Sequence, residues 1–195
     1  MLGAATDYDA AVRALRAQAL PAIVEYTETG SASGLKRVSD GPLHIVVDTR
    51  TNRIVSKTGP HGVLSDEEGD DPVTRRLFNP ACYRPTGERA MNWNGRAATA
   101  ITVAGAGNCK NEDFDLATIY TDSATNELLG ADGSETDEGV TVDYGVQYAR
   151  FNGYVMPATI SAHVRGHGWL FWVRERAEVH YSDYVFRQTR RQTGN

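Results

Sequence analysis

The chain has 195 residues, with 25 acidic and 20 basic side chains and a net charge of −5. Its length predicts a single domain, residues 1–195, whose core is large enough to fold without metals or disulfides. Hydrophobic residues make up 41% of the chain and charged residues 23%, which excludes a disordered or collagen-like protein. The net negative charge argues against nucleic-acid binding, because phosphate contacts need clustered lysine and arginine. No stretch reaches the roughly 20 apolar residues of a membrane-spanning helix.

One amphipathic helix is predicted near the N-terminus, over about residues 7–20. The segment Thr6–Asp9 offers capping oxygens and first-turn carboxylates, which suit the positive end of a helix. Pro21 ends the pattern. The apolar positions recur at helical spacing and are Tyr8, Ala11, Val12, Leu15 and Ala19.

Most of the chain after Pro21 is predicted to form antiparallel strands. Residues 140–149, 156–164 and 173–181 alternate apolar and polar side chains, which is typical of a strand with one buried face. In the first two segments the apolar faces consist of Val140, Val142, Tyr144, Val146 and Tyr148, and of Met156, Ala158, Ile160, Ala162 and Val164. Regular alternation of this kind favours antiparallel sheets with one solvated face.

Turn residues separate the predicted strands. Asp48–Val55 and Asp122–Leu129 share the pattern D-x-x-T-N followed by a charged and two apolar residues, which predicts two similar hairpin loops. Asn152-Gly153 predicts a two-residue hairpin, and Gly166-His167-Gly168 a second turn. Two acidic stretches, residues 59–72 and 131–139, are expected to be exposed loops, and residues 188–195 a frayed tail.

These elements predict a mainly β (α+β) fold. One N-terminal helix is followed by about eight to ten antiparallel strands over residues 22–187, joined as a meander. A sheet of this size twists, and one of its faces must be covered. With one helix available, the sheet is expected to curve around it into a half-barrel or incomplete barrel. Such a fold encloses a concave apolar space, where small apolar ligands bind.

The two cysteines lie in turn-rich segments. Cys82 and Cys109 in this setting favour a disulfide, which the chain-entropy model values at about 3–4 kcal/mol. Such a bridge implies an oxidising compartment, whereas two unpaired thiols would imply the cytosol. Met1–Thr6 is too short for a secretory signal, although the chain could begin at a mature N-terminus. We therefore expect a periplasmic or secreted protein whose signal peptide is absent from this sequence.

Motifs for catalysis and metal binding are weak. His163 and His167 have the H-x-x-x-H spacing of zinc ligands, but they flank a predicted glycine-rich turn and lack the adjacent glutamate of a metalloprotease. The acidic stretches Asp66–Asp71 and Asp132–Glu138 do not match the register of a calcium loop. No G-x-S-x-G or nucleotide-binding motif is present. We expect no catalytic residues, no metal and no cofactor, and a hydrolase is the weakest hypothesis.

Several segments resemble a known family. They are Ala22–Thr27, the hairpin of Leu116–Tyr120 with Leu128-Leu129, Asn152–Pro157, and the terminal Tyr181-Ser182-Asp183-Tyr184-Val185-Phe186. In this order they are similar to the periplasmic lipoprotein-carrier and outer-membrane lipoprotein-sorting (LolA-like) superfamily. The resemblance implies an incomplete antiparallel barrel with helices as a lid. It also implies an envelope protein that holds acyl chains or another apolar ligand.

The functional hypothesis is a non-enzymatic envelope protein that binds an apolar ligand, a lipid or an acyl chain, on its curved sheet. The expected ligand-binding residues are Val142, Tyr144, Val146, Tyr148, Met156, Ile160, Val164, Trp169 and Trp172. Alternation alone does not show which face turns inward, so these side chains could instead form a sealed core. The alternative is an interaction or structural subunit of an envelope assembly, with a protein partner and no small ligand. Peripheral contact with a membrane is compatible with either hypothesis.

Overall fold

The computed structural model describes residues 7–33, 41–59, 82–106, 116–137, 139–167 and 172–188. Within these ranges one helix, α1 (Asp7–Ala17), precedes ten strands, which confirms the predicted fold class. The strands are β1 (Ile23–Ser33), β2 (Leu43–Asp48), β3 (Arg53–Thr58), β4 (Tyr83–Trp93), β5 (Arg96–Gly105), β6 (Leu116–Asp122), β7 (Leu128–Asp137), β8 (Val140–Phe151), β9 (Tyr154–His167) and β10 (Trp172–Arg187).

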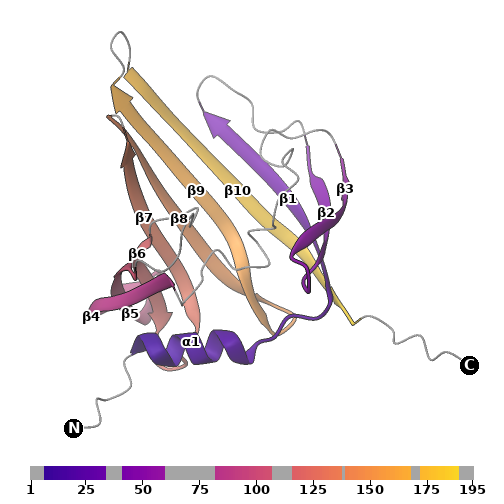
Figure 1. Cartoon of the computed structure of the whole chain (residues 1–195), viewed down its shortest axis with the longest axis horizontal. Helices are drawn as coiled ribbons and strands as arrows, with labels where there is room; N and C mark the ends of the chain where they lie inside the picture. The colour runs from indigo at the N-terminus through magenta and orange to yellow at the C-terminus, as the bar shows by residue number, and fades with distance from the viewer. Residues whose placement is uncertain are drawn as a thin grey trace, which may run out of the picture.

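All ten strands form one antiparallel sheet in the order β3-β2-β1-β10-β9-β8-β7-β6-β5-β4. The sheet consists of two meanders, β1–β3 and β4–β10, joined where the first strand pairs with the last, from Ile23 opposite Arg187 to Ser33 opposite Arg176. The edges β3 and β4 lie at opposite ends of this order, so the sheet is an open half-barrel, as predicted. Figure 1 shows the long strands β7–β10 side by side, with α1 across one end of them.

Helix α1 covers part of one sheet face, which we call the inner face. Its Tyr8 side chain is buried and donates a hydrogen bond to the Tyr83 backbone oxygen at 3.2 Å. Val12 and Leu15 pack on the same core. The helix ends at Ala17, earlier than the predicted residue 20, and the Gln18 side-chain oxygen accepts a hydrogen bond from the Val155 backbone at 2.9 Å.

The buried residues form two main clusters. The core under α1, the first cluster, joins Tyr8 to strands β4–β9 through Tyr83, Ile101, Val103, Leu116, Ile119, Leu128, Ala131, Tyr144, Val146, Tyr148 and Val155, with Cys82 preceding β4. The second cluster contains Val24, Tyr26, Leu43, Ile45, Val47, Met156, Val179, Tyr181 and Tyr184. Ile160 packs against both clusters, so it connects the two halves of the molecule.

A smaller third cluster consists of Ala98, Ala100, Tyr120 and Leu129, with Met91 and Trp93 packed against it. The rings of Trp93 and Tyr120 lie 4.1 Å apart between centroids. Trp93 also contacts Gly130, where a Cβ atom would approach the indole to 2.7 Å. Gly130 therefore leaves the space that the Trp93 indole occupies.

The two similar turns adopt the same structure. Oδ1 of Asp48 accepts the Arg50 amide at 2.9 Å, and Oδ1 of Asp122 accepts the amide two residues on at 3.0 Å. Asn52 and Asn126 have φ values of 53° and 57°, the left-handed conformation that asparagine tolerates. Arg50 also pairs with Asp48 and holds the pKa of that carboxyl at about 2. Both predicted hairpins are confirmed.

The two-residue hairpin at Asn152 and Gly153 is also confirmed, with φ values of 49° and 91°. The second predicted turn is wrong, since Gly166 and His167 continue β9 and pair with Val173 and Trp172. Residues 168–171, the acidic stretch 66–71 and the tail from 189 onward lie outside the described residues.

The predicted acidic loop at residues 131–139 is wrong up to Asp137, because that segment belongs to β7. Its polar composition is unfavourable for a strand, but the ladder to β8 runs from Gly130 opposite Gln147 to Asp137 opposite Val140. Pairing with β8, which has one apolar face, overrides the weak intrinsic preference of this segment. Asp132 also accepts a short hydrogen bond from the Tyr120 hydroxyl.

A bulge in β9 changes which side chains share a face. Gln147 pairs with Thr159, but Tyr148 pairs with Pro157, so Ala158 is an extra residue. An extra residue in a strand moves the side chains on one side of it to the opposite face. The β9 residues before Ala158 therefore point to the faces opposite to those that uninterrupted alternation would give. Met156, predicted to share a face with Ile160 and Val164, is instead fully buried in the second cluster.

A second bulge lies in β10, where Glu25 pairs with Val185 but Thr27 pairs with Ser182. Asp183 has a φ of 55°, the left-handed conformation of an inserted residue. Buried side chains accordingly fall on odd positions before it, such as Tyr181, and on the even position Tyr184 after it.

Deleting Asp183 should therefore turn Tyr184 out of the second cluster. Because truncating a buried aromatic side chain costs about 3–5 kcal/mol, the deletion should lower the free energy of unfolding by about that amount or prevent folding. Asp183→Gly, which accepts the same conformation, should change stability by less than about 1 kcal/mol. Urea unfolding compares the two variants. Equal stabilities would show that this bulge does not determine which face of the sheet the later side chains of β10 point to.

Candidate functional site

Most of the side chains predicted to contact a ligand form a continuous row across β8 and β9. Val142 pairs with Val164, Tyr144 with Ala162, and Val146 with Ile160. Residues directly opposite in an antiparallel ladder point to the same face. The row continues onto β10, where Ala177 pairs with Ala162 and Val179 with Ile160.

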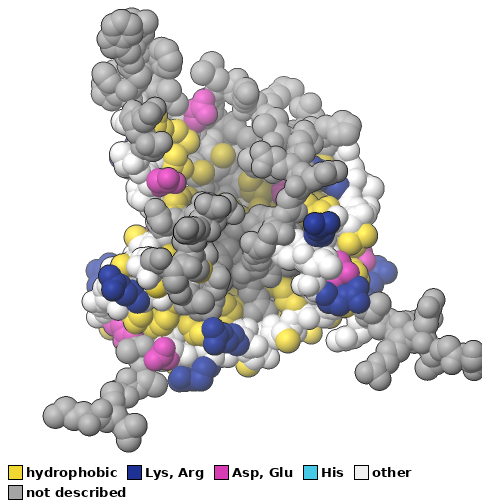
Figure 2. Space-filling model, viewed as in Figure 1, with side chains coloured by type: hydrophobic (Ala, Val, Ile, Leu, Met, Phe, Trp, Pro, Cys, Tyr) yellow, Lys and Arg dark blue, Asp and Glu magenta, His cyan; other side chains and the backbone are white. Residues whose placement is uncertain are grey.

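One end of this row is sealed and the other is not. Tyr144, Val146 and Tyr148 are 7%, 3% and 8% exposed within the core under α1. Half-buried side chains make up the other end, which we call the apolar strip: Val142, Ile160, Ala162, Val164 and Ala177. Figure 2 shows apolar side chains within the curve of the sheet.

Met156 does not join this strip, because the bulge at Ala158 places it in the second cluster. Trp172 is the first residue of β10 and pairs with His167, and Trp169 lies outside the described residues. The structure thus brings together Val142, Ile160 and Val164 as accessible candidates and places three of the others in the sealed core.

Charged residues stand at both ends of the row formed by Val142 and Val164. Glu135 pairs with Val142, and Glu175 pairs with Val164. Both therefore lie on the inner face with the two valines. Glu175 is half-buried and Glu135 is exposed, so carboxylates flank the open end of the strip.

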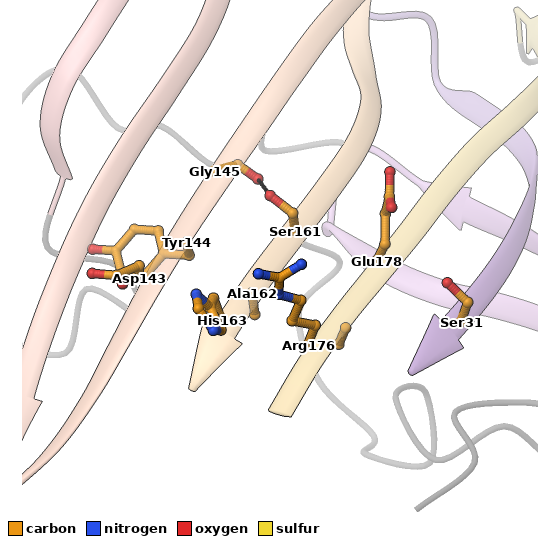
Figure 3. Close-up of a pocket in the computed structure, with 10 residues that line it drawn as sticks. Ser31, Asp143, Tyr144, Gly145, Ser161, Ala162, His163, Arg176 and Glu178 are labelled. Carbon is orange, nitrogen blue, oxygen red and sulfur yellow. Dashed lines mark hydrogen bonds between the residues drawn. The ribbon is translucent and has the colours of Figure 1, made fainter. Parts of the chain in front are cut away.

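The opposite face of the same strands carries a hollow of about 640 Å³ that includes several polar side chains (Figure 3). Cross-strand pairs build it: Asp143 and Arg176 both pair with His163, and Gly145 and Glu178 both pair with Ser161. The lining residues are Ser31, Asp143, Tyr144, Gly145, Ser161, Ala162, His163, Arg176, Ala177 and Glu178, of which Tyr144, Ala162 and Ala177 turn their side chains to the inner face. We call this site the outer hollow.

Asp143 is held as a carboxylate at one side of the outer hollow. The Ser134 hydroxyl donates to its Oδ1 at 2.8 Å, and Arg165 forms an ion pair with its Oδ2. The Ser134 hydrogen bond, together with Arg165 and the nearby His163, lowers the pKa of Asp143 below its ordinary value. Asp143 is therefore already satisfied by neighbouring side chains.

Arg176 and His163 differ from Asp143 in this respect. Within the described part of the chain, Arg176 forms no ion pair, and its side chain is exposed. Nε2 of His163 is enclosed and has no hydrogen-bond partner among the described residues. His163 was predicted to flank a glycine-rich turn, which is wrong because it lies within β9, a strand that continues to His167.

The outer hollow was not found from the sequence, although part of its signal is visible there. Polar residues alternate with apolar ones along all three strands. Only the register of the pairing shows that the polar positions Asp143, His163 and Arg176 meet in one row.

No group of three or more His, Cys, Asp or Glu side chains in the described ranges could hold a metal ion. The same ranges contain no helix that is long and apolar enough to cross a membrane.

Comparisons with known proteins find similarity in shape. A scan against protein-family models and a search of curated proteins find no match. Among solved structures, a LolA superfamily protein from Nitrosomonas europaea is 12% identical with a TM-score of 0.49, covering 95% of this chain and 96% of that one. A domain described as an outer membrane lipoprotein-sorting protein, from Vibrio parahaemolyticus, is 15% identical with a TM-score of 0.49, covering 95% and 92%.

A DUF1329 family protein from Desulfovibrio piger is 9% identical, with a TM-score of 0.47, and the match covers 92% of this chain and 91% of that one. Two of these three structures carry the family names that the sequence resemblance predicted.

Removing the Ser134 hydroxyl should raise the pKa of Asp143 toward its ordinary value, because the carboxylate loses a hydrogen bond that favours the charged form. A carboxyl group whose pKa is lowered in the folded state stabilises the fold at pH values above its ordinary pKa. This contribution is lost as the pH falls through the folded pKa. Titration of the Asp143 carboxyl carbon by NMR measures the change in Ser134→Ala. Ser161→Ala is the control, since its hydroxyl bonds to the Gly145 oxygen, and an equal rise in both variants would contradict the assignment.

Proposed function

We propose that this chain is a non-enzymatic binding protein of the cell envelope that holds an acyl chain or another apolar ligand on the inner face of its open sheet. The observation that carries the proposal is the apolar strip. It is continuous with the buried core but only half-covered by the described residues. The same function is implied by the sequence resemblance.

The shape of the strip suits a slender ligand. Bulky Tyr144 is followed across the sheet by Ala162 and then Ala177, so two small side chains lie beside a large one. Side chains this small leave room above the sheet for a hydrocarbon chain. Each methylene that such a ligand buries would contribute about 0.8 kcal/mol.

The flanking carboxylates restrict which apolar ligands fit. A fatty-acid carboxylate next to Glu135 or Glu175 would bring like charges together, which disfavours binding. A neutral head group has no such cost. The proposed ligand is therefore an acyl chain with a neutral head group rather than a free fatty acid.

A charge placed in the strip should weaken binding. Val164→Asp would put a carboxylate among the methylenes of the ligand and should reduce affinity for a fluorescent acylglycerol by more than about tenfold, because an unpaired buried charge is costly. Val55→Asp is the matched control, since Val55 is 63% exposed on β3 and should leave affinity within about twofold. Fluorescence titration measures both affinities.

A second variant keeps this test independent of folding. Ala162→Phe fills the strip without adding charge and should also reduce acylglycerol affinity, while far-UV circular dichroism stays unchanged. Organic extracts of the purified protein, examined by mass spectrometry, provide a separate readout. Empty extracts together with no probe binding would reject the ligand hypothesis and favour the interaction subunit.

We also propose that Cys82 and Cys109 form a disulfide, as expected for an oxidising envelope compartment. Cys82 is buried beside the start of β4, and its backbone oxygen accepts a hydrogen bond from Ala106 at 2.7 Å. Cys109 is three residues beyond Ala106 and lies outside the described residues. A segment of that length can reach the separation of about 5.5–6 Å between Cα atoms that a bridge requires.

The intact mass should therefore rise by two hydrogens on reduction, and alkylation should label the cysteines only after reductant is added. Cys109→Ser should lower the free energy of unfolding by about 2–4 kcal/mol under oxidising conditions and leave it nearly unchanged in reductant. Alkylation of the native, unreduced protein at both cysteines would contradict the bridge.

A further inference from the structure

The outer hollow lies on the face of the sheet opposite α1 and the apolar strip. Its polar side chains occupy the positions of β8, β9 and β10 that alternate with the strip residues, so they point away from the core. At about 640 Å³ it has the size of a site for a small ligand. A role for it is therefore independent of the apolar ligand.

The charged side chains of the outer hollow differ in whether they already have an ionic partner. Asp143 forms an ion pair with Arg165, and Oε1 of Glu178 lies 3.5 Å from Nε2 of His180. Arg176 has no ion-pair partner in the described ranges, although the chain as a whole is acidic. The Arg176 guanidinium is thus the charged group of this hollow that can bind a ligand. Its planar geometry matches the oxygens of phosphate and carboxylate groups.

Polar side chains continue from Arg176 along the same face of β10. Glu178 is exposed two residues from Arg176, and Ser31 and Ser161 pair with Glu178 from the two neighbouring strands. In Figure 3, Arg176, His163 and Ser161 lie next to one another, with Glu178 beyond them. The Ser161 hydroxyl donates to the Gly145 oxygen, so the Ser31 hydroxyl is the one that can donate to a ligand, whereas the Glu178 carboxylate can only accept hydrogen bonds.

We propose that the outer hollow binds a phosphate ester that carries free hydroxyl groups. The phosphate lies against Arg176, and the hydroxyl groups of the ligand bond to the Glu178 carboxylate and to the Ser31 hydroxyl beside it. Bare inorganic phosphate lacks the second contact and binds more weakly. The same chemistry occurs in a soluble polyol phosphate and in a phosphoglycerol lipid head group.

The experiment measures binding of glycerol 3-phosphate by isothermal titration calorimetry and by the NMR shifts of the His163 ring. Saturable binding is expected, with no binding of glycerol. Arg176→Gln should weaken the affinity by about tenfold or more, as expected for a lost charge-assisted hydrogen bond. Glu178→Gln should weaken the binding of glycerol 3-phosphate and leave the affinity for inorganic phosphate unchanged.

Arg174→Gln is the matched control. Arg174 is an exposed arginine on the same strand and face, two residues from Arg176, but it does not line the hollow. It should change affinity by less than about threefold, since it alters only the surrounding charge. Equal losses in the two arginine variants, or no saturable binding at millimolar concentrations, would overturn the proposal.

Two further arms separate the ligand sources and the two sites. Flotation with phosphatidylglycerol vesicles but not phosphatidylcholine vesicles, lost in Arg176→Gln, would identify a lipid head group as the ligand. Binding of glycerol 3-phosphate without flotation would identify a soluble ester. Acylglycerol binding should be unchanged in Arg176→Gln, so failure of this site leaves the proposed apolar site intact, and the reverse also holds.

Discussion

The structure is governed by one constraint: a broad antiparallel sheet has two faces, and the described residues supply a single helix of eleven residues to cover them. A helix of this length spans about 16 Å, which is too short to shield ten strands. The sheet meets the constraint by curving, so that its strands bury one another around Tyr8, Val12 and Leu15. Where the helix does not reach, the inner face keeps the half-buried apolar strip.

The two bulges allow one curved sheet to hold two separate cores. Without the extra residues at Ala158 and Asp183, the alternation of β9 and β10 would be uninterrupted, and Met156 and Tyr184 would leave the second cluster. Bulges bend a strand and increase its local twist. The bulges therefore provide both the curvature and the change in which face the side chains point to. Ile160 lies where the two cores meet.

Much of the fold could be predicted from local patterns, because helix periodicity, strand alternation and turn chemistry are local properties. The helix, the matched Asp48 and Asp122 turns and the Asn152 hairpin all follow from short segments. The failures have non-local causes. The acidic β7 is a strand because β8 pairs with it, and Met156 changes face because of an unpaired residue two positions away. The outer hollow also depends on register, since Asp143, His163 and Arg176 meet only when three strands are aligned.

The pairing of β1 with β10 has a consequence for how the protein folds. Val24 and Phe186 are neighbours in the ladder although nearly the whole described chain separates them in sequence. The β1–β3 meander therefore cannot join the rest of the sheet until β10 has formed. Closing so long a loop carries a large entropic cost, and sheets built from distant pairings fold slowly. Until that closure, one side of β1 and one side of β10 both present unpaired backbone groups, so the risk of aggregation is greatest before this last step.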